Sequence, residues 1–234
     1  MARLDEVNSR DISELARSRN LRTRELWPFN AYYGHADVLR AYAGIPGREP
    51  LKTAIEHGII PFVRSDPDLA TWLPRYFCAS PAQACFFEEH ALHGARPVAT
   101  GPLILYATAL APPPPATKRR LVYFDAHSTR YVSASYDVDS AIARLTALRD
   151  GFDEVVVCLY WRDVQRGRAE LYLRRGFRCV TAGHIFDPRF LFRLAEIIAS
   201  ASVVLTDNLG SHLLYALALE RPVWFDFSRA AYEV

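Results

Sequence analysis

The sequence lacks the signals of several common protein classes. Lys and Arg number 28 against 26 Asp and Glu, whereas a dedicated nucleic-acid-binding domain usually carries a dominant basic excess. The four cysteines include no Cys-x-x-Cys pair, which argues against a zinc site and against a disulfide framework. The chain also contains no Gly-x-x-x-x-Gly-Lys-Ser/Thr and no Gly-x-Gly-x-x-Gly stretch, so neither a P-loop nor a dinucleotide fingerprint is indicated.

Long apolar runs are also missing. None reaches the roughly 20 residues that a bilayer-spanning helix needs, and the first 20 residues, MARLDEVNSRDISELARSRN, are charged. We therefore expect a cytoplasmic protein without a signal peptide. An association with the inner face of a membrane stays open. Because the cysteines lie mostly in apolar stretches such as VVVCLYW, we expect them to be buried and reduced.

Half of the 234 residues are hydrophobic, which is enough for one large domain or two small ones. The stretch ALAPPPPATKRR, residues 109–120, contains four consecutive prolines. Such a run favours an extended polyproline spacer and cannot continue a helix or a central strand. The sequence therefore predicts a first lobe over residues 1–108, a linker over 109–120 and a second lobe over 121–234.

The first lobe has a β-α-β rhythm. Strands are predicted within 54–63, over 75–80 and within 96–103, and a helix over 81–94 starts with Ser80 as N-cap and Pro81 at its first position, as helix starts prefer. A strand, helix and strand in succession imply parallel pairing. At ordinary element lengths the lobe has room for about three strands, so it is a reduced one.

The second lobe repeats this rhythm more clearly. Five apolar strands alternate with four helices, which predicts a doubly wound parallel sheet. The predicted strands are RLVYFDAHS, EVVVCLYW, FRCVTAG, SVVLTD and PVWFDF, and the predicted helices are DVDSAIARLTALRDG, RGRAELYLRRG, DPRFLFRLAEIIASA and GSHLLYALALE.

Polar residues follow each of the first four strands of this lobe. Ligands of open α/β sheets bind beyond the carboxyl ends of the strands, so these residues are candidates for a binding site. At the fourth exit Gly210, Ser211 and His212 open a helix, and its N–H groups and dipole favour a phosphate. The four exits carry Asp125, His127, Ser128, Thr129 and Arg130, then Tyr160, Trp161, Arg162 and Asp163, then Gly183, His184 and Asp187, and finally Thr206 to His212.

Structural roles remain open for the same residues. Ser211 is also a preferred N-cap residue, and Asp207 a common turn residue. Tyr160 and Trp161 are aromatic residues at a strand end, which are more often core or rim than ligand contacts. A structural role, as a surface residue or a helix cap, is the alternative to ligand binding for three histidines: His127, His184 and His212.

The segment SASVVLTDNLGSHLLYALALERPVWF resembles the late part of the nucleotide-binding lobe of GT-B glycosyltransferases and of related sugar-nucleotide epimerases. There a Thr-(Asp/Asn) strand end, a Gly-containing helix start and a Pro-Val strand entry recur. Earlier segments, among them VVVCLYWRDVQRG and GFRCVTAGHIFDPRFLFRLAEII, resemble proteins of bacterial capsule and surface-polysaccharide loci. The stretches TAIEHGII and FCASPAQACFFEEHALHGARPVATGPL are similar to the first GT-B lobe. The resemblance implies two Rossmann-like lobes.

The resemblance also implies a function: transfer of a sugar from a nucleotide sugar to a polysaccharide or lipid-linked acceptor, without a metal ion or another cofactor. The leaving phosphates would meet N–H, O–H and imidazolium donors. His57, next to Glu56, would be the base that takes the acceptor proton; its alternative role is to hold the turn before Gly58. The residues implied for the donor are His127, Ser128, Thr129, Gly183, His184, Asn208, Gly210, Ser211 and His212.

Two further function classes are compatible with the sequence. One is another enzyme on the same fold, either a polyol-phosphate transferase or a sugar-nucleotide epimerase. The other is a non-catalytic partner in polysaccharide assembly. The expected partners are a nucleotide sugar and a glycan or lipid-linked acceptor, with no nucleic acid, and the oligomeric state stays open.

Overall fold

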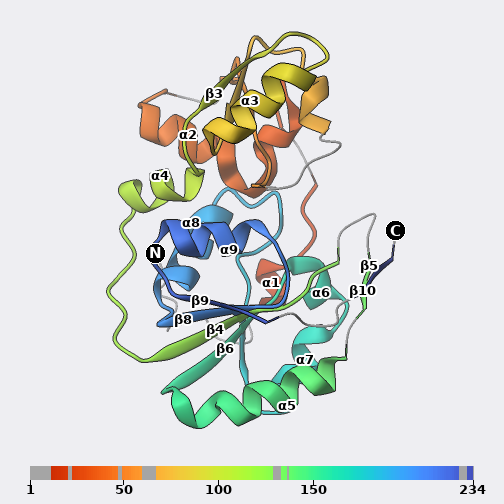
Figure 1. The fold of residues 1–234 in the computed structure, drawn as a ribbon, viewed down its shortest axis with the longest axis vertical. Helices are drawn as coiled ribbons and strands as arrows, with labels where there is room; N and C mark the ends of the chain where they lie inside the picture. The colour runs from red at the N-terminus through yellow and green to blue at the C-terminus, as the bar shows by residue number, and fades with distance from the viewer. Residues whose placement is uncertain are drawn as a thin grey trace. The chain divides into compact units, whose positions relative to one another are not determined.

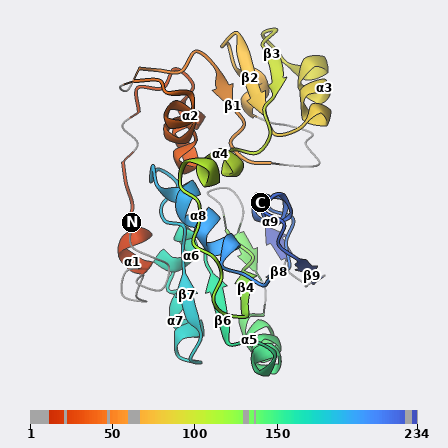
Figure 2. The ribbon, with the colours of Figure 1, turned by 90° about the vertical axis from the view of Figure 1, so that its left-hand side faces the viewer.

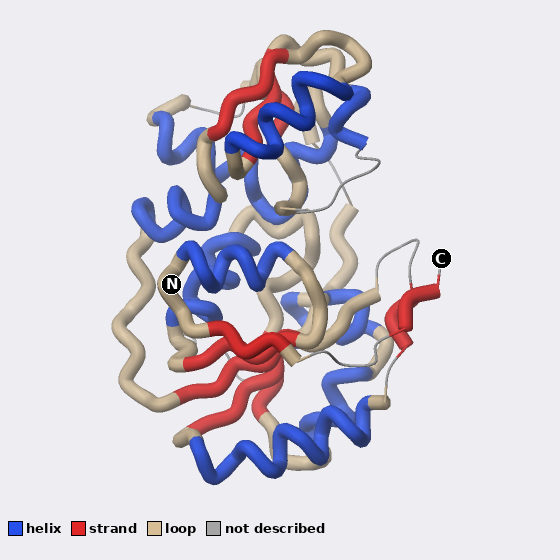
Figure 3. The backbone as a smooth tube through the Cα atoms, in the orientation of Figure 1, coloured by secondary structure: helices blue, strands red, loops and turns tan. Residues whose placement is uncertain are grey.

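The computed structural model describes residues 12–20, 23–46, 49–59, 67–128, 133–135, 137–226 and 231–233. The protein is α/β, with one parallel sheet of five strands and one of three, drawn in red in Figure 3. The chain forms two compact units. The five-stranded unit comprises Met1–Ser18, Pro113–His184 and Arg193–Val234, and the three-stranded unit comprises Arg19–Pro112 and Ile185–Phe192.

The five-stranded sheet has the Rossmann-like strand order β7-β6-β4-β8-β9, with all strands parallel. Every residue of the central strand β4 is buried, as expected of an apolar strand covered on both faces. The chain runs from β4 to β6 and β7 on one side and then to β8 and β9 on the other. The strand order therefore reverses between β4 and β8, which is where ligands of such sheets bind. The strands are β4 (Arg120–Phe124), β6 (Glu154–Cys158), β7 (Arg178–Val180), β8 (Val203–Thr206) and β9 (Val223–Phe225).

Helices cover both faces of this sheet, with α5 and α7 on one face and α8 and α9 on the other (Figure 1). α5 begins after Asp137, whose carboxylate accepts the N–H of Ser140 at 3.1 Å and so satisfies a donor that the helix itself cannot pair. The helical elements are α1 (Ile12–Leu15), α5 (Val138–Leu148), η4 (Arg149–Gly151), α6 (Trp161–Gln165), α7 (Arg168–Leu173), α8 (Phe190–Ala199) and α9 (Ser211–Ala218).

The predicted parallel sheet of five strands with intervening helices is confirmed. Two features were not predicted. The short helix α6 directly follows the β6 exit, and β5 (Ser133–Ser135) pairs antiparallel with β10 (Ala231–Glu233), with Ala134 opposite Tyr232. Elements of three to five residues are too short to show the periodicity on which a sequence-based prediction depends.

The three-stranded sheet is parallel in the order β1-β2-β3, with α3 beside it (Figure 2). The predicted start of α3 is confirmed, since Ser80 Oγ accepts the N–H of Gln83 at 3.2 Å and Pro81 is the first helical residue. The predicted end at Gly94 is wrong: the backbone of Ala91 is already extended. The elements are β1 (Ala54–Ile55), β2 (Arg75–Cys78), α3 (Pro81–His90) and β3 (Arg96–Ala99).

Four helical elements complete the three-stranded unit, and none of them was predicted. α2 and α4 pack together, with the rings of Tyr42 and Tyr106 in a T-shaped contact at 4.6 Å. The elements are η2 (Pro28–Gly34), α2 (His35–Ala43), η3 (Pro67–Ala70) and α4 (Leu103–Leu110). The core of this unit contains Ala54, Leu73, Tyr76, Cys78, Phe87 and Ala95.

The two units divide at the proline run, between Pro112 and Pro113. Two segments belong to a different unit from the one that their position in the sequence predicts. Residues 12–18 fall in the predicted first lobe but belong to the five-stranded unit, where the Gln165 side chain donates to the Ala16 carbonyl at 2.7 Å. Ile185–Phe192 falls in the predicted second lobe but belongs to the three-stranded unit. Each unit is therefore assembled from separate segments.

The four cysteines are free thiols. Cys78, Cys158 and Cys179 are buried, as predicted, but Cys85 is exposed. The expectation for Cys85 is wrong because α3 lies along its sheet with only Phe87 fully buried, so an apolar stretch of this helix faces solvent. None of the helices in the described part of the chain combines the length and the apolar character required to cross a membrane.

Candidate functional site

The exits of β4 and β8 lie side by side because the two strands pair in parallel, with Phe124 opposite Thr206. The β4 exit continues into residues 125–128 and the β8 exit into residues 207–212, at the start of α9. The sheet thus brings together two of the four strand exits that the sequence singled out as candidates for a binding site. This pair of exits is the candidate functional site of the five-stranded unit.

His212 holds a packed position in this site. Its Nε2 lies 2.7 Å from Thr206 Oγ1, and its ring stacks on Phe124 with a centroid distance of 4.6 Å. Burial, with a smaller contribution from His127, lowers the pKa of His212 to about 3. His212 is therefore neutral at physiological pH, and the predicted imidazolium donor is wrong at this position. Loss of hydration on burial disfavours the charged form.

Gly210 is the N-cap of α9, with an extended backbone at φ −110° and ψ 170°. A Cβ at this position would lie 2.7 Å from both Cε1 and Nδ1 of His212, closer than carbon and nitrogen atoms normally approach. Packing against the His212 ring therefore requires a glycine. Ser211 is the first residue of α9, so its alternative role as the N-cap is wrong.

Two buried carboxylates lie beside this helix start. The Tyr123 hydroxyl donates to Asp207 Oδ2 at 2.6 Å and lies 3.3 Å from Asp125 Oδ1. Burial and the negative charges of the two aspartates raise the pKa of Tyr123, so the phenol keeps its proton. The Asn208 side chain donates to the Asp125 carbonyl at 3.4 Å. Tyr123 was missed because an aromatic residue inside an apolar strand gives no functional signal.

Asp207 combines a charge partner with an unsatisfied oxygen. Its Oδ2 lies 3.7 Å from the guanidinium of Arg144 on α5, which also pairs with Asp226 beyond β9. Within the described residues its Oδ1 is buried without a hydrogen-bond partner. Buried polar atoms rarely remain unsatisfied. Asp207 Oδ1 is therefore a candidate acceptor for a ligand hydroxyl at the strand exits.

An aspartate–arginine network shapes the β4 exit. The Ser128 N–H donates to Asp163 Oδ2 at 3.1 Å, and Arg168 donates to the Ala126 carbonyl at 3.0 Å while lying 3.3 Å from Asp163. His127 contacts Tyr160 with a centroid distance of 4.9 Å. Burial lowers the pKa of His127, and Asp163 partly opposes this. The predicted contact at Thr129 lies outside the described residues.

Gly183 and His184, two of the residues implied for the donor, follow β7 and lie at a distance from the start of α9. β7 is three strands from β8 in the sheet order, which corresponds to roughly 14 Å at the usual strand spacing. Gly183 has φ +104° and donates its N–H to Thr181 Oγ1 at 3.2 Å. The His184 ring packs on Trp161 with a centroid distance of 4.1 Å, and the backbone N–H of His184 donates to the Leu15 carbonyl in α1 at 2.9 Å.

The two predicted catalytic residues have different partners. Glu56 is buried; its carboxylate accepts the Ala79 N–H at 2.8 Å and the side-chain amide of Gln83. It thereby ties the end of β1 to the start of α3. His57 instead places Nδ1 3.2 Å from Asp68 Oδ2. The Asp68 carboxylate is therefore a partner of the His57 ring.

Asp68 is the partner that sequence reasoning missed. It is fully buried, and besides its contact with His57 it accepts the indole N–H of Trp27 at 2.8 Å. A histidine whose Nδ1 is held by a carboxylate has its tautomer and ring orientation defined, which is how a general base is prepared. Asp68 is 11 residues from His57, a spacing that carries no local signal.

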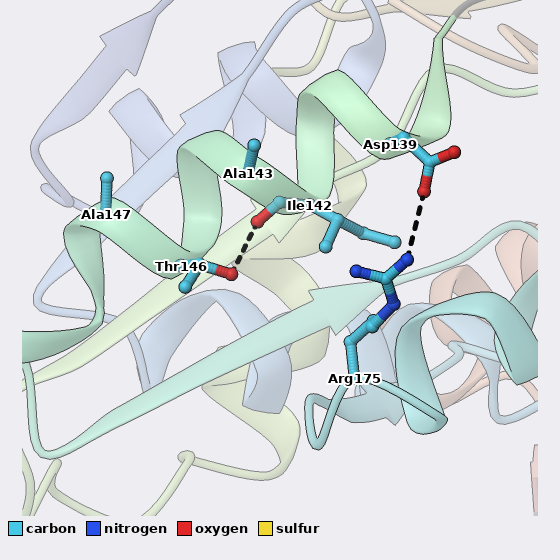
Figure 4. A pocket seen from close by; sticks show the side chains of 6 residues that line it. All are labelled: Asp139, Ile142, Ala143, Thr146, Ala147 and Arg175. Carbon is cyan, nitrogen blue, oxygen red and sulfur yellow. Dashed lines mark hydrogen bonds and ion pairs between the residues drawn. The ribbon is translucent and has the colours of Figure 1, made fainter.

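A surface hollow of about 570 Å³ lies along α5 and is shown in Figure 4. Arg175 closes one side of it, 3.5 Å from Asp139. None of the predicted site residues lines this hollow. No group of three or more His, Cys, Asp and Glu side chains is arranged to hold a metal ion in the described part of the chain.

Comparison of the sequence with protein-family models and with curated proteins found no match. Two groups of residues therefore bear on the function, together with the sequence resemblance. They are the paired exits of β4 and β8 and the His57–Asp68 pair.

Proposed function

We propose that this protein is a glycosyltransferase that moves a sugar from a nucleotide-sugar donor to a glycan or lipid-linked acceptor. The observation that supports this most directly is the pairing of the β4 and β8 exits at the point where the strand order reverses. α9 begins there, with a glycine at its N-cap. A helix start of this kind stabilises the negative charge that develops on a leaving phosphate.

The residues at these exits have complementary tasks in the proposal. Backbone N–H groups at the start of α9 face the phosphates, and Asp207 Oδ1 accepts a hydroxyl of the ribose or of the donor sugar. Neutral His212 contacts the hydroxyl oxygen of Thr206, and the same oxygen accepts the backbone N–H of Asn208 at 3.3 Å. Through Thr206, His212 therefore positions Asn208 and the start of the helix. The residues after β7, Gly183 and His184, are assigned to binding the nucleotide base of the donor.

His57 is assigned as the general base. In the transfer step the acceptor oxygen forms a bond to the anomeric carbon while the bond from that carbon to the phosphate oxygen breaks. The acceptor proton passes to His57 Nε2, and the nucleotide departs with the bonding electron pair. Asp68, on Nδ1, stabilises the imidazolium that forms.

The first test of the proposal is nucleotide binding by the five-stranded unit. Thermal shift and calorimetry are measured with UDP, CDP, CMP, GDP and their sugar derivatives, because a ligand that binds only the folded state raises its stability. Asp207→Asn removes a charged hydroxyl acceptor, so binding should weaken about 10- to 100-fold, the equivalent of about 1.5–3 kcal/mol. Asp139→Asn on the exposed side of α5 is the matched control and should bind as the wild type does.

Two results would contradict this assignment. One is a folded wild-type protein that binds none of these nucleotides. The other is an equal loss of affinity in Asp207→Asn and Asp139→Asn. Incubation of the binding nucleotide sugar without acceptor, followed by NMR, separates a transferase from an epimerase, because only an epimerase accumulates an isomeric product in the absence of an acceptor.

A further inference from the structure

Three partly buried aromatic rings form what we call the aromatic collar: Phe29 and Tyr32, which lie next to His57, and Phe186, which lies next to Tyr32. The centroids of Phe29 and Tyr32 lie 5.4 and 6.1 Å from that of His57. Phe186 lies 5.4 Å from Tyr32. The planes within these three pairs are inclined by 36°, 84° and 45°. The rings therefore form a curved surface rather than a closed stack.

The backbone that carries the collar is held in an unusual conformation. Tyr33 has φ +57° and Gly34 has φ +72°. An aromatic residue in the left-handed region is uncommon, and such conformations persist only where the surroundings enforce them. Here the Tyr33 N–H donates to the Ile185 carbonyl at 2.6 Å. The strained turn is thereby joined to the segment that carries Phe186.

The backbones of Gly34 and Pro188 also approach each other closely. A Cβ on Gly34 would overlap the carbonyl oxygen of Pro188 and would lie 2.8 Å from its carbonyl carbon. In addition, the Tyr33 ring packs on Phe190 with a centroid distance of 4.8 Å. Residues 28–34 and 185–190 are thus fixed against each other, so the collar is preorganised.

A buried carboxylate orients two side chains at the collar. Asp68 holds both the His57 ring and the Trp27 indole, and the Trp27 ring meets Phe29 edge to face at 5.4 Å. Burial, and to a lesser extent His57, lower the pKa of nearby His35 to about 3, so His35 brings no charge to this cluster. An apolar surface with a small number of placed polar groups is the usual composition of a small-molecule site.

From this geometry we propose that the collar is a subsite for a pyranose ring of the acceptor. The inference rests on the proposed function, and it specifies that the acceptor presents a carbohydrate ring, rather than a lipid chain or a phosphate, next to His57. A pyranose has an apolar C–H face, which packs on aromatic rings, and a rim of hydroxyls, which reach polar groups such as the His57 imidazole and the Tyr32 phenol.

Carbohydrate fits the collar better than an aliphatic chain does. A chain would favour a continuous apolar channel, whereas the collar includes the Tyr32 phenol and adjoins the His57 imidazole. A free phosphate would favour several cations, whereas the His57 ring lies beside a carboxylate, with Nδ1 3.2 Å from Asp68 Oδ2. The pattern of apolar faces interrupted by hydrogen-bonding edges matches the surface of a sugar.

The test is saturation-transfer NMR on the full chain with cellobiose, chitobiose and octyl β-D-glucopyranoside below its micelle concentration. The expected result is transfer to the pyranose C–H protons. Tyr32→Leu and Phe186→Leu keep an apolar side chain but remove a ring, and each should weaken sugar binding roughly 2- to 10-fold, as expected for one lost aromatic contact. Tyr42→Leu is the matched control, because Tyr42 is exposed on α2 and contacts Tyr106; it should leave binding unchanged.

Three results would overturn the subsite. These are no transfer to any of the three probes, transfer confined to the octyl chain, and transfer that neither Tyr32→Leu nor Phe186→Leu weakens. Circular dichroism checks that the variants fold, and Tyr32→Phe, which keeps the ring and loses only the hydroxyl, should weaken binding less than Tyr32→Leu does. Nucleotide binding is measured at residues of the five-stranded unit, so intact nucleotide affinity with no sugar binding would refute the collar alone.

Discussion

Gly210→Ala is expected to destabilise the protein chiefly through the His212 side chain, although the added Cβ would also lie 3.1 Å from Asn208 Oδ1. The added Cβ would lie 2.7 Å from the His212 ring, which cannot move freely because it stacks on Phe124 and contacts Thr206 at 2.7 Å. The backbone of Gly210, with φ −110°, is in a region open to alanine, so no backbone strain is added. The cost therefore arises from the displacement of His212.

The size of the effect follows from three contributions. Overpacking costs about 1–3 kcal/mol, and loss of the Thr206–His212 hydrogen bond costs about 1 kcal/mol. Replacement of a glycine by alanine returns about 0.4–1 kcal/mol by restricting the unfolded chain. We expect a net loss of about 2 kcal/mol, which corresponds to about 4–8 °C in the melting temperature of a protein of this size.

Urea unfolding, followed by circular dichroism, measures this loss as a change in midpoint at constant slope. Gly151→Ala is the matched control, because a Cβ at Gly151 meets no atom within 4 Å, and it should be neutral or slightly stabilising. In the double variant Gly210→Ala/His212→Ala the penalty of the alanine should largely disappear, since its collision partner is gone. The coupling between the two sites should be about 1 kcal/mol or more.

The packing argument is refuted if Gly210→Ala is as stable as Gly151→Ala, or if the effects of Gly210→Ala and His212→Ala simply add. Either outcome would mean that the His212 ring moves aside without cost.

Two further predictions concern pH and a second glycine. Burial lowers the pKa of His212 and of His35 to about 3, below the value of about 6.5 that a histidine has in the unfolded chain. The stability gained by keeping them neutral is therefore complete above about pH 6.5 and is lost as the pH falls from there toward 3. Between pH 7.5 and pH 5.0, urea titrations should show that His212→Gln loses about 2 kcal/mol less stability than the wild type does. Gly34→Ala should destabilise the three-stranded unit by roughly 3 kcal/mol or more, because left-handed strain adds to overlap with the Pro188 backbone; hydrogen exchange checks this against Gly44→Ala, where φ is +64° but no atom lies within 4 Å, and an equal loss in both variants would contradict the role of the overlap.

Sequence patterning predicted the regular elements wherever they were long enough to repeat. The apolar run of β4 and the alternation of strands and helices after it indicated a parallel sheet, and Ser80 followed by Pro81 marked the start of α3. The pattern failed for α4, whose sequence LILYATAL is apolar nearly throughout and so shows no helical period, and α2 was missed although it buries Val38 and Leu39 on one side. It also failed for the three-residue strands β5 and β10, which contain no repeat at all.

The candidate site was predicted in position but not in chemistry. The residues at the β4 and β8 exits were named because parallel strands must end on the same edge of a sheet. The sequence did not indicate that His212 is neutral, since the pKa of a histidine depends on how much water its neighbours remove. Nor did it identify Tyr123 as the link between Asp125 and Asp207, because these contacts join residues of two strands.

The sequence alone determined the α/β class and the parallel second sheet, since these follow from local sterics and the spacing of apolar residues. The tertiary structure decided which side chains meet. Asp68 rather than Glu56 holds His57, residues 185–192 belong to the three-stranded unit, and the strained turn at Tyr33 positions the aromatic collar. Each of these depends on contacts between residues distant in the chain, which form only when packing brings separate segments together, and local patterns carry no record of them.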